Sequence, residues 1–155
     1  MVWLIEITAC ASGERFFPGR KLYKMPIDYD IIEDKQIVVA KGSGVVTGAD
    51  VISHLDSLAA DSRYTAPMKK IIDYRSIESI EISPEDAVTI ALKKDTFSPK
   101  FRGERCAFVS PGNATYGTSR VHQSLVNTTD INTAVFRQIE EALDWLGVTI
   151  DMNLD

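Results

Sequence analysis

The apolar positions along the chain follow two different spacings. Short β-prone runs alternate with longer stretches in which apolar residues recur every three or four positions, as on one face of a helix. The short runs predict strands at residues 29–32, 36–40, 68–74, 106–109 and 132–136. The longer stretches predict helices at residues 47–61, 83–94, 114–126 and 139–147.

Several of the predicted helices have recognisable ends. Thr47 and Asp50 have the form of a capping box. Ser83 stands before a proline and two acidic residues, an order that favours a helix start with Ser83 as the N-cap. The last helix carries a regular apolar stripe and stops at a glycine. The stripe consists of Ile139, Ala142, Leu143 and Leu146, and the glycine is Gly147.

The order of the predicted elements indicates the fold class. Strands that alternate with helices are typical of crossover connections and of a mainly parallel sheet. The polar segment 33–35 is short enough to join the first two strands as an antiparallel hairpin. We therefore expect an α/β fold with a mixed, mostly parallel sheet of four or five strands and about four helices.

The same pattern suggests how the chain is divided. Residues 1–24 contain turn residues and no sustained period, whereas the regular pattern begins near Met25. We expect an N-terminal arm at residues 1–24, an α/β domain at residues 25–148 and a C-terminal tail at residues 149–155.

Composition points to a globular protein of a reducing compartment. The chain has 155 residues, of which 45% are hydrophobic and 25% are charged, as is ordinary for one globular domain. No apolar run approaches the roughly 18 residues of a membrane-spanning helix, and the apolar N-terminus is interrupted by Glu6. The two cysteines, Cys10 and Cys106, form no CxxC pair. These features predict a cytoplasmic protein without stable membrane insertion.

Charge and motif content argue against several functions. The net charge of −5 disfavours nucleic acid as a partner, and we interpret the basic residues between Lys93 and Arg105 as a solvated face beside a loop. The two histidines, His54 and His122, have no second ligand at metal-binding spacing, so we expect no metal. No GxSxG motif is present.

The glycines at 42–44 follow a predicted strand and precede a predicted helix, which is the context of a dinucleotide-binding loop. The third glycine of that motif is replaced by Thr47, however. We interpret the glycines as a place where the strand bends towards the first helix. Together with the missing motifs, this predicts a protein that has no cofactor and is not an enzyme.

A candidate binding site lies at the predicted carboxyl ends of the strands, where open α/β sheets bind ligands. Its residues are Asp73, Arg75, Ser110, Asn113 and Arg137, with Arg120 nearby. Arginines beside a hydroxyl and an amide suit an anion or a polar head group. The alternative is that Asp73 pairs with an arginine and the other residues cap helices.

Several short strings resemble the SpoIIAA-like, or STAS-like, small bacterial proteins, which are grouped near the CRAL-TRIO lipid-binding fold. These strings are residues 42–44, 47–50, 73–75, 117–120 and 141–147. The resemblance covers residues 25–147. It implies a four- or five-stranded sheet with helices and a non-enzymatic, often dimeric protein.

The resemblance also implies a candidate switch. In the anti-sigma antagonist branch of these proteins, a serine in a strand-to-helix motif is phosphorylated. Ser83 falls at the corresponding helix start. The chain departs from the motif, with Glu81 and Ile82 before the serine and Pro84 in place of glycine.

Two functions follow from these observations. The first is a regulatory or protein-interaction module of STAS type. The second is a carrier of a small amphipathic or lipid-like ligand in a pocket at the carboxyl edge of the strands. The candidate pocket walls are Phe97, Phe101, Tyr116 and Trp145. We also expect a homodimer, because of the resemblance and because the predicted arm carries Trp3, Phe16 and Phe17.

Overall fold

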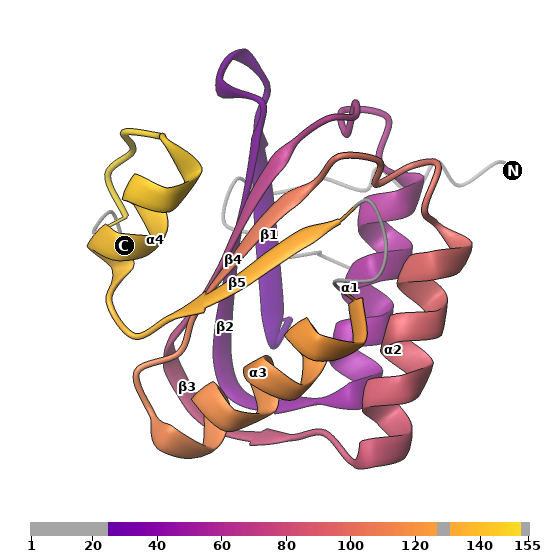
Figure 1. Ribbon diagram of the computed structural model, residues 1–155, viewed down its shortest axis with the longest axis vertical. Helices are drawn as coiled ribbons and strands as arrows, with labels where there is room; N and C mark the ends of the chain where they lie inside the picture. The colour runs from indigo at the N-terminus through magenta and orange to yellow at the C-terminus, as the bar shows by residue number, and fades with distance from the viewer. Residues whose placement is uncertain (1–24, 127–130, 153–155) are drawn as a thin grey trace, which may run out of the picture.

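A single five-stranded sheet with helices on both faces forms the described part of the chain, residues 25–126 and 131–152, in the computed structural model (Figure 1). The strands are β1 (Ile27–Ile32), β2 (Ile37–Thr47), β3 (Lys69–Glu81), β4 (Arg105–Val109) and β5 (Asn132–Phe136). The helices are α1 (Gly48–Ala60), α2 (Pro84–Thr96), α3 (Asn113–Val126) and α4 (Ile139–Leu146). The predicted order of strands and helices is confirmed.

The strands lie in the sheet in the order of the sequence, β1-β2-β3-β4-β5. β1 and β2 are antiparallel, and each later pair is parallel. A short 3-10 turn at Glu33–Lys35 joins β1 to β2 and ends at Gln36, whose φ of 50° is left-handed. Ile32 therefore pairs directly with Ile37. The predicted hairpin and the mixed, mostly parallel sheet are both confirmed.

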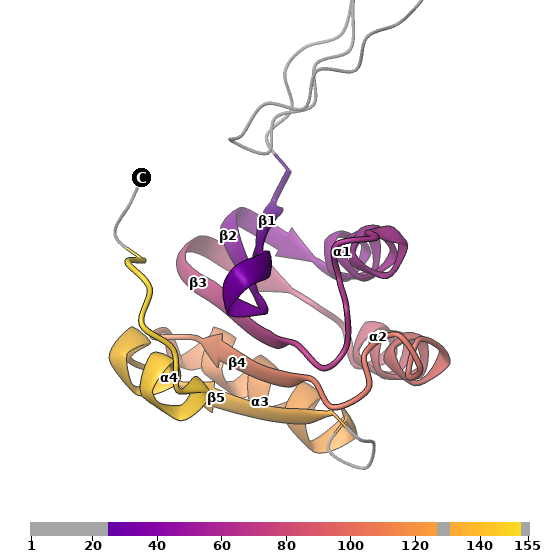
Figure 2. The same cartoon turned by 90° about the horizontal axis from the view of Figure 1, so that it is seen from above.

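The helices are divided unequally between the two faces of the sheet. α1, α2 and α3 lie side by side on one face, with α2 between the other two, and α4 covers the opposite face (Figure 2). Alternation along the strands gives each face its own core. The face under α4 carries Ile37, Ile71, Ala107 and Val109, which pack against Ile139, Ala142, Leu146 and Met152. Met152 is buried, so the packed region reaches past α4 into the segment that the sequence suggested as a tail.

β2 and β3 are much longer than the apolar pattern predicted. They continue past the edge of β4 as a two-stranded ribbon that ends with Thr47 opposite Glu81. Two shifts of register interrupt the pairing of this ribbon, between Lys41 and Ser43 and between Gly44 and Val45, and at each of them β3 has one residue more than β2. Gly44 has a φ of 63°, a conformation that favours glycine. The glycines lie inside β2, which continues to Thr47, and not at its end; that they bend the strand towards α1 stays an interpretation.

Both predicted helix caps are present. The side chain of Thr47 accepts a hydrogen bond from the backbone of Asp50, and that of Ser83 accepts one from the backbone of Asp86 at 3.0 Å. The carboxylate of Asp86 in turn accepts from the backbone N–H of Ser83 at 3.0 Å. The starts of α1 and α2 lie close together. A Cβ atom added to Gly48 would lie only 2.5 Å from the carboxyl carbon of Asp86. Within residues 25–126 and 131–152, no helix is long and apolar enough to span a membrane.

Candidate binding site between helices α2 and α3

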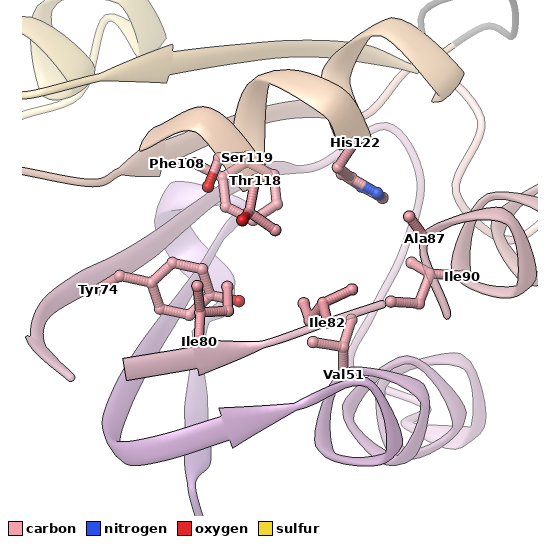
Figure 3. Close-up of a pocket in the computed structure, with 10 residues that line it drawn as sticks. All are labelled: Val51, Tyr74, Ile80, Ile82, Ala87, Ile90, Phe108, Thr118, Ser119 and His122. Carbon is pink, nitrogen blue, oxygen red and sulfur yellow. The ribbon is translucent and has the colours of Figure 1, made fainter. Parts of the chain in front are cut away.

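A pocket opens between α2 and α3 above the sheet (Figure 3). It encloses about 360 Å³ of space free of protein atoms, part of which is open to solvent. The pocket is lined by Val51, Tyr74, Ile80, Ile82, Ala87, Ile90, Phe108, Thr118, Ser119 and His122. Most of these side chains are apolar, so the pocket favours an apolar occupant.

Local sequence explains why space remains here. α2 presents Ala87 towards the pocket, and α3 presents Thr118 and Ser119, so small side chains face each other where the two helices meet the sheet. The floor extends beyond β4 because β3 continues as far as Glu81, which brings Ile80 beneath the helices. The long β3 ribbon is therefore what gives the pocket its outer wall.

Tyr74 and His122 are the polar rings of the pocket. The ring of His122 meets Phe108 edge-on with centroids 5.5 Å apart, and the ring of Tyr74 lies 5.9 Å from the same Phe108. Figure 3 shows the Tyr74 hydroxyl directed into the pocket and His122 pointing across it towards Ala87. Burial raises the pKa of Tyr74 and lowers the pKa of His122 well below its usual range. Both rings are therefore uncharged at neutral pH.

A buried charged cluster lies on the same side of the sheet as the pocket. Lys70 on β3 and Lys94 on α2 approach one carboxylate oxygen of Glu104, with Nζ–Oε1 distances of 3.2 Å and 3.6 Å. Burial is the main cause of the low pKa of His122, and the positive charges of Lys94 and Lys70 lower this pKa further. The sequence pattern did not predict this cluster. A signal was available, since Lys94 follows Ala87 and Ile90 on the buried stripe of α2.

Exposed aliphatic side chains lie on the two helices that form the pocket. Val88 and Leu92 lie one turn apart on α2 and are 49% and 63% exposed. Val121 and Leu125 lie one turn apart on α3 and are 53% and 39% exposed. We call these four residues the α2–α3 rim.

Contacts on the far sides of the two helices fix the direction of the rim. Lys93 of α2 pairs with Asp56 of α1 at 2.8 Å, so the side of α2 that faces α1 is the side of Lys93. At 3.6 residues per turn, Val88 lies on the other side of the buried stripe, and Leu92 lies almost opposite the stripe, away from the sheet. On α3, Gln123 donates to the Thr133 carbonyl of β5, so this side of the helix faces β5. Val121 and Leu125 lie on the other side of α3 and therefore face α2.

The predicted anion site is spread over separate places. Asp73 and Arg75 pair with each other, with Nη2–Oδ2 at 2.9 Å, and Arg75 also donates to the Met152 carbonyl. Asp73 does not end its strand as the sequence suggested, because β3 continues to Glu81. Arg137 donates to Asn113 Oδ1 and to the Pro111 carbonyl, both at 3.0 Å.

The other predicted residues also have partners within the chain. Ser110 is buried and lies 3.1 Å from the hydroxyl of Ser119, and Arg120 donates to Gln123 at 2.7 Å. The pairing of Asp73 with an arginine matches the alternative interpretation of these residues. Anion binding by the six residues stays a prediction.

The aromatic residues proposed as pocket walls lie elsewhere, and that prediction is wrong. Phe101 is fully buried and packs against Tyr64 and Phe97. Tyr116 stacks under Arg137, with the guanidinium carbon 4.2 Å from the ring centroid. Trp145 belongs to α4 on the opposite face of the sheet. None of the four aromatic residues proposed as walls is among the residues that line the pocket between α2 and α3.

This arrangement defines the class of fold: an open, mixed α/β sheet that begins with an antiparallel hairpin, with three helices on one face and one on the other. Comparison with solved structures identifies it as a SpoIIAA-like fold. The predicted fold class and the resemblance to SpoIIAA-like proteins are thereby confirmed.

Two of the similar structures have the same TM-score, 0.51. One is a DUF3478-family protein with a SpoIIAA-like fold from Shewanella loihica PV-4, which is 23% identical and aligns over 83% of this chain and 99% of its own. The other is the anti-sigma factor antagonist SpoIIAA in its unphosphorylated form, which is 14% identical and aligns over 80% of this chain and 99% of its own. The sequence matches no family model and no curated protein.

Proposed function

We propose that this chain is a non-enzymatic, STAS-like interaction module that binds an apolar segment of a partner protein along the α2–α3 rim. The observation that carries the proposal is the position of the four rim residues. The described part of the chain has six large hydrophobic side chains that are exposed, and four of them lie on α2 and α3, the two helices between which the pocket opens. Single exposed aliphatic residues are ordinary, whereas a cluster of them beside a pocket is typical of interaction sites.

The charge around the rim supports a partner segment with basic flanks. Glu85 and Asp95 are exposed at the two ends of α2, and the whole chain has a net charge of −5. An apolar segment flanked by Lys or Arg would fit this surface, with the apolar contacts giving affinity and the charges orienting the partner. The likeness to SpoIIAA, an anti-sigma factor antagonist, agrees with a role in regulation through protein contacts.

A second candidate function is supported by the pocket itself. Because its walls are mostly apolar and its mouth is open, it could accept a small amphipathic ligand, with or without a protein partner.

The partner proposal can be tested by site-specific photocrosslinking in cells. A photoreactive phenylalanine analogue at Leu92 should form an adduct with a protein partner. The same analogue at Ser124, which is exposed on α3 but lies off the rim, should not. The partner identified in this way should bind the Leu92→Asp variant at least about tenfold more weakly than wild type, whereas Ser124→Asp should bind normally. Equal adducts at both positions, or unchanged binding by Leu92→Asp, would overturn the proposal.

A further inference from the structure

We infer that the partner protein inserts the tip of one branched aliphatic side chain, from a valine, leucine or isoleucine, into the pocket between α2 and α3. This inference rests on the proposed interaction along the α2–α3 rim. It adds the kind of residue by which the site selects its partner.

The size of the pocket limits what can enter it. The space between the two helices includes open solvent, and the part that a water-sized group can occupy measures only about 30 Å³. Pockets for drug-sized ligands begin at roughly 300 Å³. A methyl group is about as large as a water molecule, which needs roughly 10–15 Å³, so the pocket holds about two methyl groups. It therefore has room for the branched end of an aliphatic side chain but not for an aromatic ring.

The walls of the pocket favour a hydrocarbon group. Ile80, Ile82 and Ile90 contribute aliphatic side chains, and Phe108 contributes an aromatic ring (Figure 3). No Asp, Glu, Lys or Arg is among the lining residues, and nearly all of the surface that they expose to the pocket is apolar. Such walls hold water poorly, because a buried water molecule needs roughly two to four polar partners. A hydrocarbon group, in contrast, gains free energy when it leaves water for this space.

A side chain of a bound protein suits this pocket better than a free molecule does. A molecule of about two or three carbon atoms gains too little free energy to offset the translational and rotational freedom that it loses on binding. A partner that is already held along the rim has lost that freedom, so the apolar contacts of its side chain add to the affinity. Buried anchor residues of this kind are typical of the centre of protein interfaces.

The rim is continuous with the pocket. On α3, Val121 lies three residues after Thr118, and Leu125 lies three residues after His122. Each of these exposed side chains is therefore about one turn from a residue that lines the pocket. On α2, Val88 directly follows a lining alanine. A partner segment that contacts the rim is thus placed to direct one of its side chains into the pocket.

The charge at one end of the pocket indicates which residues stand beside the anchor. Glu81 is exposed and lies between Ile80 and Ile82, which both line the pocket. Glu85 is exposed in the first turn of α2. These carboxylates would attract a Lys or Arg next to the inserted side chain. The partner motif is accordingly one aliphatic residue with a basic neighbour.

Xenon tests the pocket without any partner, because it binds in apolar cavities of proteins. Methyl NMR spectra of the full-length protein should show saturable shifts of Ile80, Ile82 and Ile90 as the xenon pressure rises. Thr118→Ile, which adds a carbon atom to the pocket wall, should abolish these shifts. Thr89→Ile is the matched control, since both threonines donate to the carbonyl four residues earlier, but Thr89 is exposed on α2. Wild-type protein without saturable shifts would disprove the inference.

Partner binding separates an anchor site from a simple gap in the packing. Thr118→Ile should melt at the same temperature as wild type or higher, because it fills a space. It should nevertheless bind the partner crosslinked at Leu92 at least about tenfold more weakly, whereas Thr89→Ile should bind normally. If Thr118→Ile does not fold, Ala87→Val fills the same space from α2 and takes its place. A folded, filled variant with full affinity for the partner would show a packing gap and sink the inference.

The anchor itself can be identified on the partner. In the segment that crosslinks at Leu92, one valine, leucine or isoleucine should lose at least about tenfold in affinity when it is replaced by alanine, and also when it is replaced by phenylalanine. If no single aliphatic residue behaves in this way while Leu92→Asp still weakens binding, the inference falls and the proposed function stands. If no protein crosslinks at Leu92, both fall.

Discussion

The Nζ atom of Lys70 lies 3.2 Å from Oε1 of Glu104, and both side chains are completely buried. Lys94 approaches the same oxygen at 3.6 Å, and Tyr64 donates to the other carboxylate oxygen at 2.6 Å. Burial alone would raise the pKa of Glu104, but the two ammonium groups outweigh burial and lower it. Burial lowers the pKa of Lys94, and Lys70 lowers it further, whereas the nearer Glu104 holds the pKa of Lys70 above its usual value. The carboxylate of Glu104 is therefore the group that keeps two lysines inside the fold.

Replacing Glu104 by glutamine should destabilise the protein strongly. The variant keeps the shape of the side chain but leaves buried ammonium groups without a counter-charge, a change that costs about 3–5 kcal/mol in comparable cases. Urea denaturation would measure the free energy of unfolding. Glu78→Gln, at an exposed position of β3, is the matched control and should change it by less than about 0.5 kcal/mol. Equal effects of the two substitutions would show that the cluster contributes little.

His54 should make the protein less stable in mild acid. Its side chain is 4% exposed, and within the described residues neither ring nitrogen has a hydrogen-bond partner. Burial first, and the charge of Lys70 second, lower its pKa from 6.5 to about 3. The unfolded chain therefore binds a proton at His54 below pH 6.5, whereas the folded chain does so only near pH 3. The stability contributed by neutral His54 is complete above pH 6.5 and falls as the pH decreases from 6.5 towards 3.

The His54→Phe variant isolates this effect, because His122 and the carboxylates titrate in both proteins. Phenylalanine should keep the edge contact that the His54 ring makes with Tyr29, whose centroid is 5.3 Å away. Urea denaturation at several values between pH 7.5 and 4.5 should give a flatter dependence for the variant, with a difference in slope of up to about 1.4 kcal/mol per pH unit. Parallel curves for the two proteins would contradict the low pKa.

The sequence pattern predicted the elements of this fold well where caps and periodicity agreed. Thr47 and Ser83 mark helix starts because capping depends on a few neighbouring residues. The outer half of β3 was missed because Ile77 and Ile80 are three residues apart, among serines and glutamates, and so lack the alternation of a half-buried strand. That half is stabilised by pairing with β2, an interaction between residues distant in sequence.

The candidate site was harder to predict for a related reason. Part of its wall comes from small residues such as Ala87 on α2 and Ser119 on α3. The space between them cannot be predicted from the sequence, because it depends on how the two helices pack against each other. The buried cluster likewise joins Lys70, Lys94 and Glu104 from three separate parts of the chain. In each case the decisive property is a tertiary contact and not a local pattern.

Removal of the predicted arm should leave the domain stable. Residues 1–24 lie outside the described residues, and β1 begins at Ile27, just after Met25. A chain that starts at Met25 should unfold within about 1 kcal/mol of the full-length protein, because unpacked termini contribute little to stability. Urea denaturation of the two proteins makes the comparison. A much larger loss would show that Trp3, Leu4 or Phe16 packs against the domain or a partner chain.

Self-association is a separate prediction. We expect the full-length protein to form a homodimer, because the resemblance to SpoIIAA-like proteins implies one and because the arm carries large aromatic residues, among them Trp3, Phe16 and Phe17. Light scattering at micromolar concentrations should give the mass of two chains. Repeating the measurement on the chain that starts at Met25 would show whether the arm is needed. A clean monomer mass for the full-length protein would refute the prediction.

Ser83 should act as a helix cap and not as a phosphorylation switch. The Ser83 hydroxyl accepts from the Asp86 backbone N–H, and the Asp86 carboxylate accepts from the Ser83 backbone N–H, so the serine is already part of a closed capping box. A phosphate would gain from the helix dipole but would stand among Glu81, Glu85 and Asp86, and these opposing effects are each of order 1 kcal/mol. Ser83→Ala should therefore cost about 1 kcal/mol of stability in urea denaturation, and Ser83→Asp should be nearly neutral because aspartate also caps. If Ser83→Asp instead kept full stability but abolished binding to the partner crosslinked at Leu92, Ser83 would be the switch.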